Sequence, residues 1–261
     1  MKFIKGMLLS IFLLFVITIQ VEAKYVRENN FMDKKGSQRI AEIKKFQAYC
    51  NLPVTGKLDN QTSKMLYTEN MLVVDEIAYP PSNGPWIAIN KTNRSLTMYN
   101  GNKVLFKFPV ALGTSKTPTP SGKGTIRNKV VNPAWGGMNG KYPPAAADDP
   151  KNPLGERWMG LNLTGFNGYG IHGTILPKQI GGYVSNGCIR MFNYDIENYI
   201  FPNAKVGMPV WLGTTEELKS WGLTQDLIEI KQEISVPNKT ENLIDETKEV
   251  ENYQTDELLV F

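Results

Sequence analysis

Short runs of alternating apolar and polar residues fill the middle of this chain and limit what it can fold into. The clearest run is 103–112, in which Val104, Phe106 and Phe108 alternate with their neighbours, a pattern typical of a half-buried β-strand. Asn100-Gly101 comes just before it and favours a hairpin turn. Because the 23 glycines and 16 prolines also disfavour long helices, the sequence predicts a mainly β body. Further strands are expected at 86–89, 96–99, 160–163, 169–172 and 209–212.

Helical spacing is confined to short segments on either side of this body. Ile40, Ile43 and Phe46 recur at helical intervals, and Asp59 is expected to cap a second helix. This helical pair is too small to bury much surface by itself. The predicted organisation is a signal peptide at 1–23, a small α-helical domain at 28–75, a linker at 76–85, the main β domain at 86–213, a short helix at 214–224 and an acidic, disordered tail at 225–261.

The first residues have the pattern of an export signal. Lys2 and Lys5 precede the apolar run 7–19, and Val21-Glu22-Ala23 offers a small-residue cleavage site. The apolar run is shorter than the roughly 20 residues that a membrane span needs. We therefore expect cleavage after Ala23, no stable membrane span afterwards, and an exported protein of the cell wall or extracytoplasmic space.

The net charge of +4 is unevenly distributed. Residues 226–261 contain ten acidic and three basic residues, which leaves a clearly basic body before them. A basic body suits an anionic polymer such as a cell wall, and also nucleic acid or anionic lipid, so charge alone does not select the partner.

Two glycine-rich motifs have the residues for nucleophilic catalysis. They are 169–174, which contains His172, and 185–191, which contains Cys188. A cysteine nucleophile needs an imidazole to take its proton and return it to a leaving amine. Each residue alone suits a structural role, but the two motifs together favour a catalytic pair, with backbone N–H groups near Gly187 able to hold an oxyanion.

His172 is the only histidine in the chain. Any cysteine–histidine pair must therefore use it. The same count argues against zinc hydrolases, which usually use two or three histidines. No metal and no organic cofactor is expected. The irregular segment 132–157 is long for a compact domain, and such segments often serve as lids.

The region 84–212 resembles the L,D-transpeptidase (YkuD) catalytic domain. The segments that carry the resemblance are 117–122 (Thr-Pro-Thr-Pro-Ser-Gly), 152–160 (Asn-Pro-Leu-Gly-Glu-Arg-Trp-Met-Gly), 170–174 (Gly-Ile-His-Gly-Thr) and 185–190 (Ser-Asn-Gly-Cys-Ile-Arg). The resemblance implies a β-sandwich with a flap over the active site, and 132–157 would be that flap. At Asn186 many members carry histidine, which leaves fine specificity open.

The same resemblance implies a reaction on peptidoglycan stem peptides. Cys188 would attack the carbonyl that precedes the terminal D-Ala of a tetrapeptide, and His172 would protonate the leaving amine. The side-chain amine of a second stem would then resolve the thioester. The Gly173 carbonyl would orient the imidazole, and Arg190 is a candidate for binding a substrate carboxylate. The other expected substrate-binding residues are Tyr169, Ser185, Asn186 and Gly187.

Residues 43–66 resemble the second half of a peptidoglycan-binding domain, whose first half is degenerate here. Wall binding and a structural cap remain equal interpretations of this segment. Hydrolysis of the same thioester would make the protein an L,D-carboxypeptidase, and a non-catalytic wall-binding protein is the remaining alternative. Carbapenems are expected to acylate Cys188, because a strained lactam mimics the acyl donor, and no nucleic-acid partner is expected.

Overall fold

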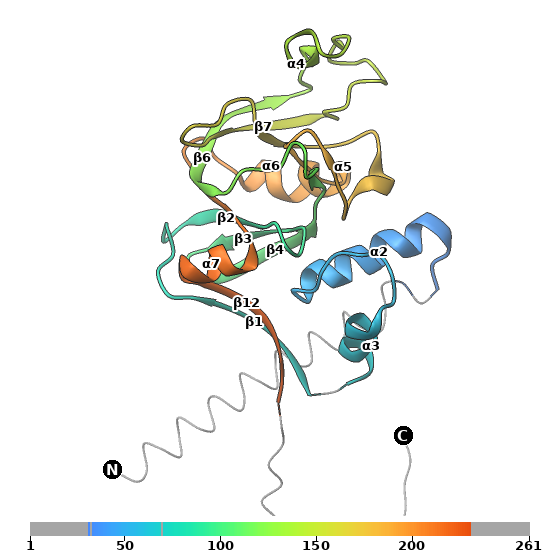
Figure 1. The fold of residues 1–261 in the computed structure, drawn as a ribbon, viewed down its shortest axis with the longest axis vertical. Helices are drawn as coiled ribbons and strands as arrows, with labels where there is room; N and C mark the ends of the chain where they lie inside the picture. Colours follow the sequence, from blue (N-terminus) through green and yellow to red (C-terminus); the bar gives the residue numbers. More distant parts are fainter. Residues whose placement is uncertain (1–30, 32, 69, 231–261) are drawn as a thin grey trace, which may run out of the picture. The chain divides into compact units, whose positions relative to one another are not determined.

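Eight strands from the middle of the chain form one curled sheet (Figure 1). The computed structural model describes residue 31, residues 33–68 and residues 70–230. The predicted signal peptide and the predicted tail beyond residue 230 lie outside the described residues. No described helix is long and apolar enough to cross a membrane.

The elements of the N-terminal part are α2 (Gly36–Tyr49), α3 (Asn60–Tyr67) and β1 (Met71–Ile77). Those of the middle are β2 (Pro85–Asn90), β3 (Ser95–Asn100), β4 (Lys103–Pro109), β5 (Leu112–Gly113), β6 (Gly122–Val131), α4 (Gly137–Gly140), β7 (Arg157–Asn162), β8 (Gly170–His172) and η1 (Pro177–Gln179). The chain continues with β9 (Tyr183–Ser185), β10 (Ile189–Arg190), α5 (Asn193–Asp195), η2 (Ile196–Ile200), α6 (Phe201–Asn203), β11 (Pro209–Gly213), α7 (Thr215–Ser220) and β12 (Leu223–Glu229).

The strand order of the sheet is β10-β8-β7-β6-β11-β2-β3-β4. Strand β11 joins its two halves, because it pairs parallel with β2 and antiparallel with β6. Ile89 and Met98 from one half share a buried cluster with Met159 and Leu161 from the other. The sheet therefore folds over one core, and the predicted mainly β, sandwich-like fold is confirmed. The predicted Asn100-Gly101 hairpin is also present, with Asn100 opposite Lys103.

The helical pair has its own small core. Phe46, Met65 and Cys50 are buried together between α2 and α3. Asp59 caps α3 as predicted, since its carboxylate accepts a hydrogen bond from the Thr62 N–H at 2.9 Å. The side-chain amide of the fully buried Gln47 fixes the loop between the helices. Its Nε2 donates a hydrogen bond to Lys57 O, and its Oε1 accepts one from the Gly56 N–H.

Strands β1 and β12 form an antiparallel ribbon. This ribbon shows that two predictions were wrong, the start of the tail and the purely helical character of the N-terminal domain. The tail was predicted to begin at residue 225, but β12 continues to Glu229, and the last residues of the predicted helical domain are strand. The reason is that Gln225 points inward although the surrounding sequence is acidic. It is 4% exposed, and its amide donates hydrogen bonds to Thr97 Oγ1 at 3.0 Å and Tyr99 Oη at 2.8 Å.

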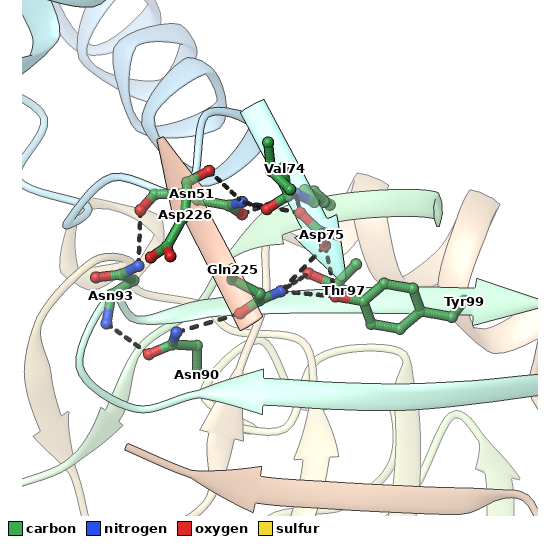
Figure 2. Close-up of polar contacts among 10 residues, drawn as sticks. Asn51, Val74, Asp75, Asn90, Asn93, Thr97, Tyr99, Gln225 and Asp226 are labelled. Atoms are coloured by element: carbon green, nitrogen blue, oxygen red, sulfur yellow. Dashed lines mark hydrogen bonds and ion pairs between the residues drawn. The ribbon is translucent and has the colours of Figure 1, made fainter. Parts of the chain in front are cut away.

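A buried polar network ties this ribbon and the end of α2 to the sheet (Figure 2). The Asn51 amide donates hydrogen bonds to Val74 O at 3.0 Å and to Asp75 Oδ1 at 2.8 Å, and the Tyr99 hydroxyl donates to the same carboxylate. Lys107 forms a buried ion pair with Asp75. Removing one partner of such a pair typically costs about 3–5 kcal/mol of stability. The helical pair is thus attached to the sheet by buried contacts.

Candidate active site

A cleft of about 810 Å³ lies between the irregular segment 132–157 and the β7-β8-β10 end of the sheet. Trp135, Met138 and Tyr142 line it from the irregular segment. His172 and Cys188, which lie outside that segment, also line the cleft. The prediction that residues 132–157 cover the site agrees with this placement. Within the segment, the buried Asn152 amide donates a hydrogen bond to Pro133 O at 2.7 Å and holds the two ends together.

Cys188 follows a tight turn between β9 and β10. Gly187 has φ of +115°, which strongly favours glycine, and a Cβ there would lie 2.5 Å from the Tyr169 ring. The Ser185 hydroxyl accepts a hydrogen bond from the Gly187 N–H at 3.0 Å and donates one to Cys188 O at 2.7 Å. Ser185 is buried and lines the cleft, whereas Gly187 is buried and does not line it. Both residues shape the turn through these contacts.

The Cys188 thiol borders the cleft and is half-buried. Its sulfur lies 3.7 Å from the Gly168 carbonyl oxygen. Burial raises the pKa of the Cys188 thiol, and the Gly170 N–H and the Arg190 charge offset only part of this effect. The thiol is therefore protonated near neutral pH and needs a base before it can attack.

His172 and Cys188 face the same cleft because of the register of β8 and β10. These strands are parallel, with Ile171 beside Ile189 and His172 beside Arg190. Side chains alternate along a strand, so residues 170 and 172 share a face with residues 188 and 190. This register places the imidazole next to the strand that Cys188 precedes.

The His172 ring is neutral and fixed in one tautomer. Its Nδ1 lies 2.7 Å from Gly173 O, and a carbonyl can only accept, so Nδ1 carries the proton and Nε2 keeps its lone pair. Burial is the main cause that lowers the pKa of His172 to about 4, and the Arg190 charge adds to it. Trp158 stacks on the imidazole with ring centroids 5.8 Å apart.

Gly173 must be glycine because of its surroundings. A Cβ on it would lie 2.4 Å from the Asn193 amide oxygen and 3.2 Å from Leu154 O. The same Asn193 oxygen accepts a hydrogen bond from the Thr174 N–H at 2.6 Å. The backbone at Gly173, whose carbonyl orients His172, is therefore tightly packed against Asn193 and Leu154.

The remaining predicted site residues border the cleft in different ways. Tyr169 and Arg190 line it, and Arg190 donates a hydrogen bond to Gln179 Oε1 at 2.9 Å while its buried Nε has no partner. The Asn186 amide lies 3.4 Å from the Tyr142 hydroxyl of the covering segment. Among the described residues, no group of three or more metal-ligating side chains occurs.

Sequence reasoning missed several residues of this site. Trp158 belongs to a segment that was recognised, but nothing in the sequence marks it as the partner of His172. Tyr142 lies in the irregular segment 132–157, which contains no motif. Asn193 lies beyond the motif at 185–191. The Thr-Pro-Thr-Pro segment carried part of the family resemblance without a predicted role in the site, although Thr119 is 4% exposed and contacts the Cys188 turn. Of these missed residues, only Thr119 could have been found from the sequence, because it belongs to the repeated Thr-Pro motif.

Comparisons with known proteins identify the family of this chain. The family model described as L,D-transpeptidase catalytic domain matches residues 84–212, and a peptidoglycan-binding domain model matches residues 23–66. The Bacillus subtilis protein named "Putative L,D-transpeptidase YqjB" is 36% identical over 133 residues, which are 50% of this chain and 72% of that protein. The B. subtilis protein named "Putative L,D-transpeptidase YkuD" is 37% identical over 110 residues, which are 42% of this chain and 55% of that protein.

Among solved structures, the catalytic domain of an L,D-transpeptidase from E. faecium matches with 24% identity and a TM-score of 0.41. The match covers 51% of this chain and 99% of that one. By its sequence similarity to YqjB over most of that protein's length, the chain belongs to the L,D-transpeptidase family.

Proposed function

We propose that this protein is a cysteine-dependent L,D-transpeptidase that cross-links peptidoglycan stem peptides. The observation that carries the proposal is the placement of His172. Its Nδ1 is committed to the Gly173 carbonyl, and its ring and the Cys188 thiol line one cleft. A neutral imidazole that shares a cleft with a protonated thiol is the starting state that general-base activation requires.

In the first half-reaction, the Cys188 sulfur attacks the carbonyl that precedes the terminal D-Ala of a donor tetrapeptide. The thiol proton moves to His172 Nε2 as the S–C bond forms, and the carbonyl oxygen becomes an oxyanion. The oxyanion collapses, the C–N bond breaks, and the proton passes from the imidazole to the departing amine of D-Ala. A thioester on Cys188 and a neutral imidazole remain.

In the second half-reaction, the side-chain amine of another stem peptide attacks the thioester. His172 Nε2 takes a proton from this amine and returns it to the departing sulfur, which restores the thiol. Arg190 is proposed to bind a carboxylate of the donor, because its guanidinium lines the cleft and keeps a buried Nε without a partner. Tyr169 and Asn186 border the same space and are proposed to contact the stem peptide.

The cellular setting follows from the sequence. The export pattern of residues 1–23 and the basic body both suit work on an anionic cell wall outside the cytoplasm. The helical pair is proposed to hold the enzyme against the wall or to act as a cap on the sheet. The buried contacts of Asn51 and Lys107 with Asp75 favour a fixed attachment over a freely swinging module.

Mass spectrometry of a muropeptide reaction tests the proposal. Purified protein incubated with disaccharide-tetrapeptides is expected to give dimers and to release one D-Ala for each dimer. Tripeptide monomers without dimers would replace the transpeptidase assignment with an L,D-carboxypeptidase, in which water resolves the same thioester. No product at all would favour a non-catalytic wall-binding protein.

A further inference from the structure

The Thr-Pro-Thr-Pro segment lies against the back of the turn that carries Cys188. Thr119 is 4% exposed, and its hydroxyl donates a hydrogen bond to Gly187 O at 2.8 Å while it accepts one from the Gly113 N–H at 2.9 Å. Thr117, two residues earlier, donates to Ser185 O at 3.1 Å. The two hydroxyls therefore hold two carbonyls of the turn, and neither threonine lines the cleft.

The contact to Gly187 O also determines where the Cys188 N–H points. Both groups belong to one peptide unit, and no cis peptide occurs in the described residues. In a trans peptide the carbonyl and the N–H point in opposite directions. Because Thr119 holds the carbonyl, the Cys188 N–H is directed away from Thr119. Cys188 lines the cleft and Thr119 does not, so this direction suits a donor that faces the cleft.

The packing behind the turn leaves this peptide little freedom to rotate. A Cβ on Gly113 would lie 2.8 Å from Gly187 Cα and 2.7 Å from the Thr119 N atom. The Gly187 N–H is meanwhile occupied by the Ser185 hydroxyl. The Gly187–Cys188 peptide is thus held from both of its flanks.

We infer that Thr119 is a positioning residue that orients the Cys188 N–H as the donor to the oxyanion. This inference rests on the proposed function, since an oxyanion forms only if Cys188 attacks a carbonyl. A donor that is fixed before the reaction stabilises the developing charge without reorganising. The repeated threonine motif then has a role in orienting a group that takes part in catalysis.

Two reactions of Cys188 separate this role from a merely structural one. Acylation by a carbapenem forms the S–C bond, passes through an oxyanion and breaks the lactam C–N bond, whose nitrogen takes the thiol proton. Alkylation by iodoacetamide forms an S–C bond and releases iodide and a proton, with no oxyanion. Loss of an oriented N–H should therefore slow the first reaction and spare the second.

The test compares both rate constants in wild type, Thr119→Val, Thr119→Ser and Thr117→Val. We expect Thr119→Val to slow acylation by about a hundredfold or more, the effect of losing one oxyanion donor, with alkylation little changed. Thr119→Ser keeps the hydroxyl and should restore acylation. Thr117→Val, the matched comparison, removes a hydroxyl that binds Ser185 O and leaves the contact to Gly187 O in place. It should slow acylation much less than Thr119→Val does.

Other outcomes overturn the inference. Equal acylation of wild type and Thr119→Val would do so, as would a parallel change in both rate constants or failure of serine to rescue. If the valine variant does not fold, Thr119→Ala removes the hydroxyl without the added methyl group, and the same comparison applies. A wild-type protein that a carbapenem does not acylate would instead contradict the proposed function.

Discussion

Replacing Cys188 with alanine is expected to lower the rate of cross-linking by at least about a thousandfold, because the acyl group then has no covalent acceptor. The cleft itself should persist, since the turn is held by Ser185 and Thr119 through contacts to the backbone. Dimer formation from tetrapeptide muropeptides, followed by mass spectrometry, measures the effect.

The chain offers its own control for this prediction. Cys50 is equally a cysteine but is buried between α2 and α3, so Cys50→Ala should keep its cross-linking activity. Thermal melting of both variants checks that they are folded. A Cys188→Ala protein that still formed dimers would show that cross-linking does not pass through a thioester on Cys188.

Replacing His172 with glutamine is expected to slow acylation by about 10²–10⁴-fold at neutral pH, the usual range for loss of a general base. The two pKa shifts also predict a change in pH dependence. The wild-type imidazole has a pKa of about 4 and so remains a base across the neutral range. The thiol pKa is raised, so the thiol stays protonated there. The wild-type rate should be nearly flat from weakly acidic to neutral pH.

The glutamine variant should behave differently because it depends on preformed thiolate. Below the thiol pKa the thiolate fraction rises about tenfold per pH unit, and the variant's acylation rate should rise with it. Stopped-flow or intact-mass kinetics with a carbapenem across this pH range makes the comparison. A variant with the flat profile of wild type would show that His172 is not the base.

Much of the fold could be predicted from local patterns. The Asn100-Gly101 pair corresponds to the hairpin between β3 and β4, and Asp59 caps α3 where the sequence placed it. The alternation at 103–108 predicted strand β4 but not its burial, since Val104 and Leu105 are both 40% exposed. These features depend on neighbours in the chain, which a sequence displays directly. The pairing of β1 with β12 depends on Met71 meeting Glu229, residues far apart in the sequence. The acidic composition of residues 225–261 predicted a tail. Nothing in the sequence around Gln225 indicates that its side chain is buried.

The site shows the same division. The chemical identity of Cys188 and His172 followed from the motifs and from the single histidine. Their shared face followed only from the parallel register of β8 with β10, which no local pattern encodes. The neutral state of His172 arises from burial and from Arg190, so it too required the three-dimensional arrangement. Thr119 belongs to a motif visible in the sequence, but its role depends on the distant Gly187 carbonyl.

The most direct test of the central claim, that Cys188 accepts the acyl group, is intact-mass analysis after treatment with a carbapenem. A strained lactam presents Cys188 with a reactive carbonyl and needs no acceptor peptide, so the result does not depend on how the thioester is later resolved. We predict one adduct on the wild-type protein, mapped by peptide analysis to Cys188, and the same adduct on Cys50→Ala. An unmodified wild-type protein, or an adduct that persists in Cys188→Ala, would contradict the claim.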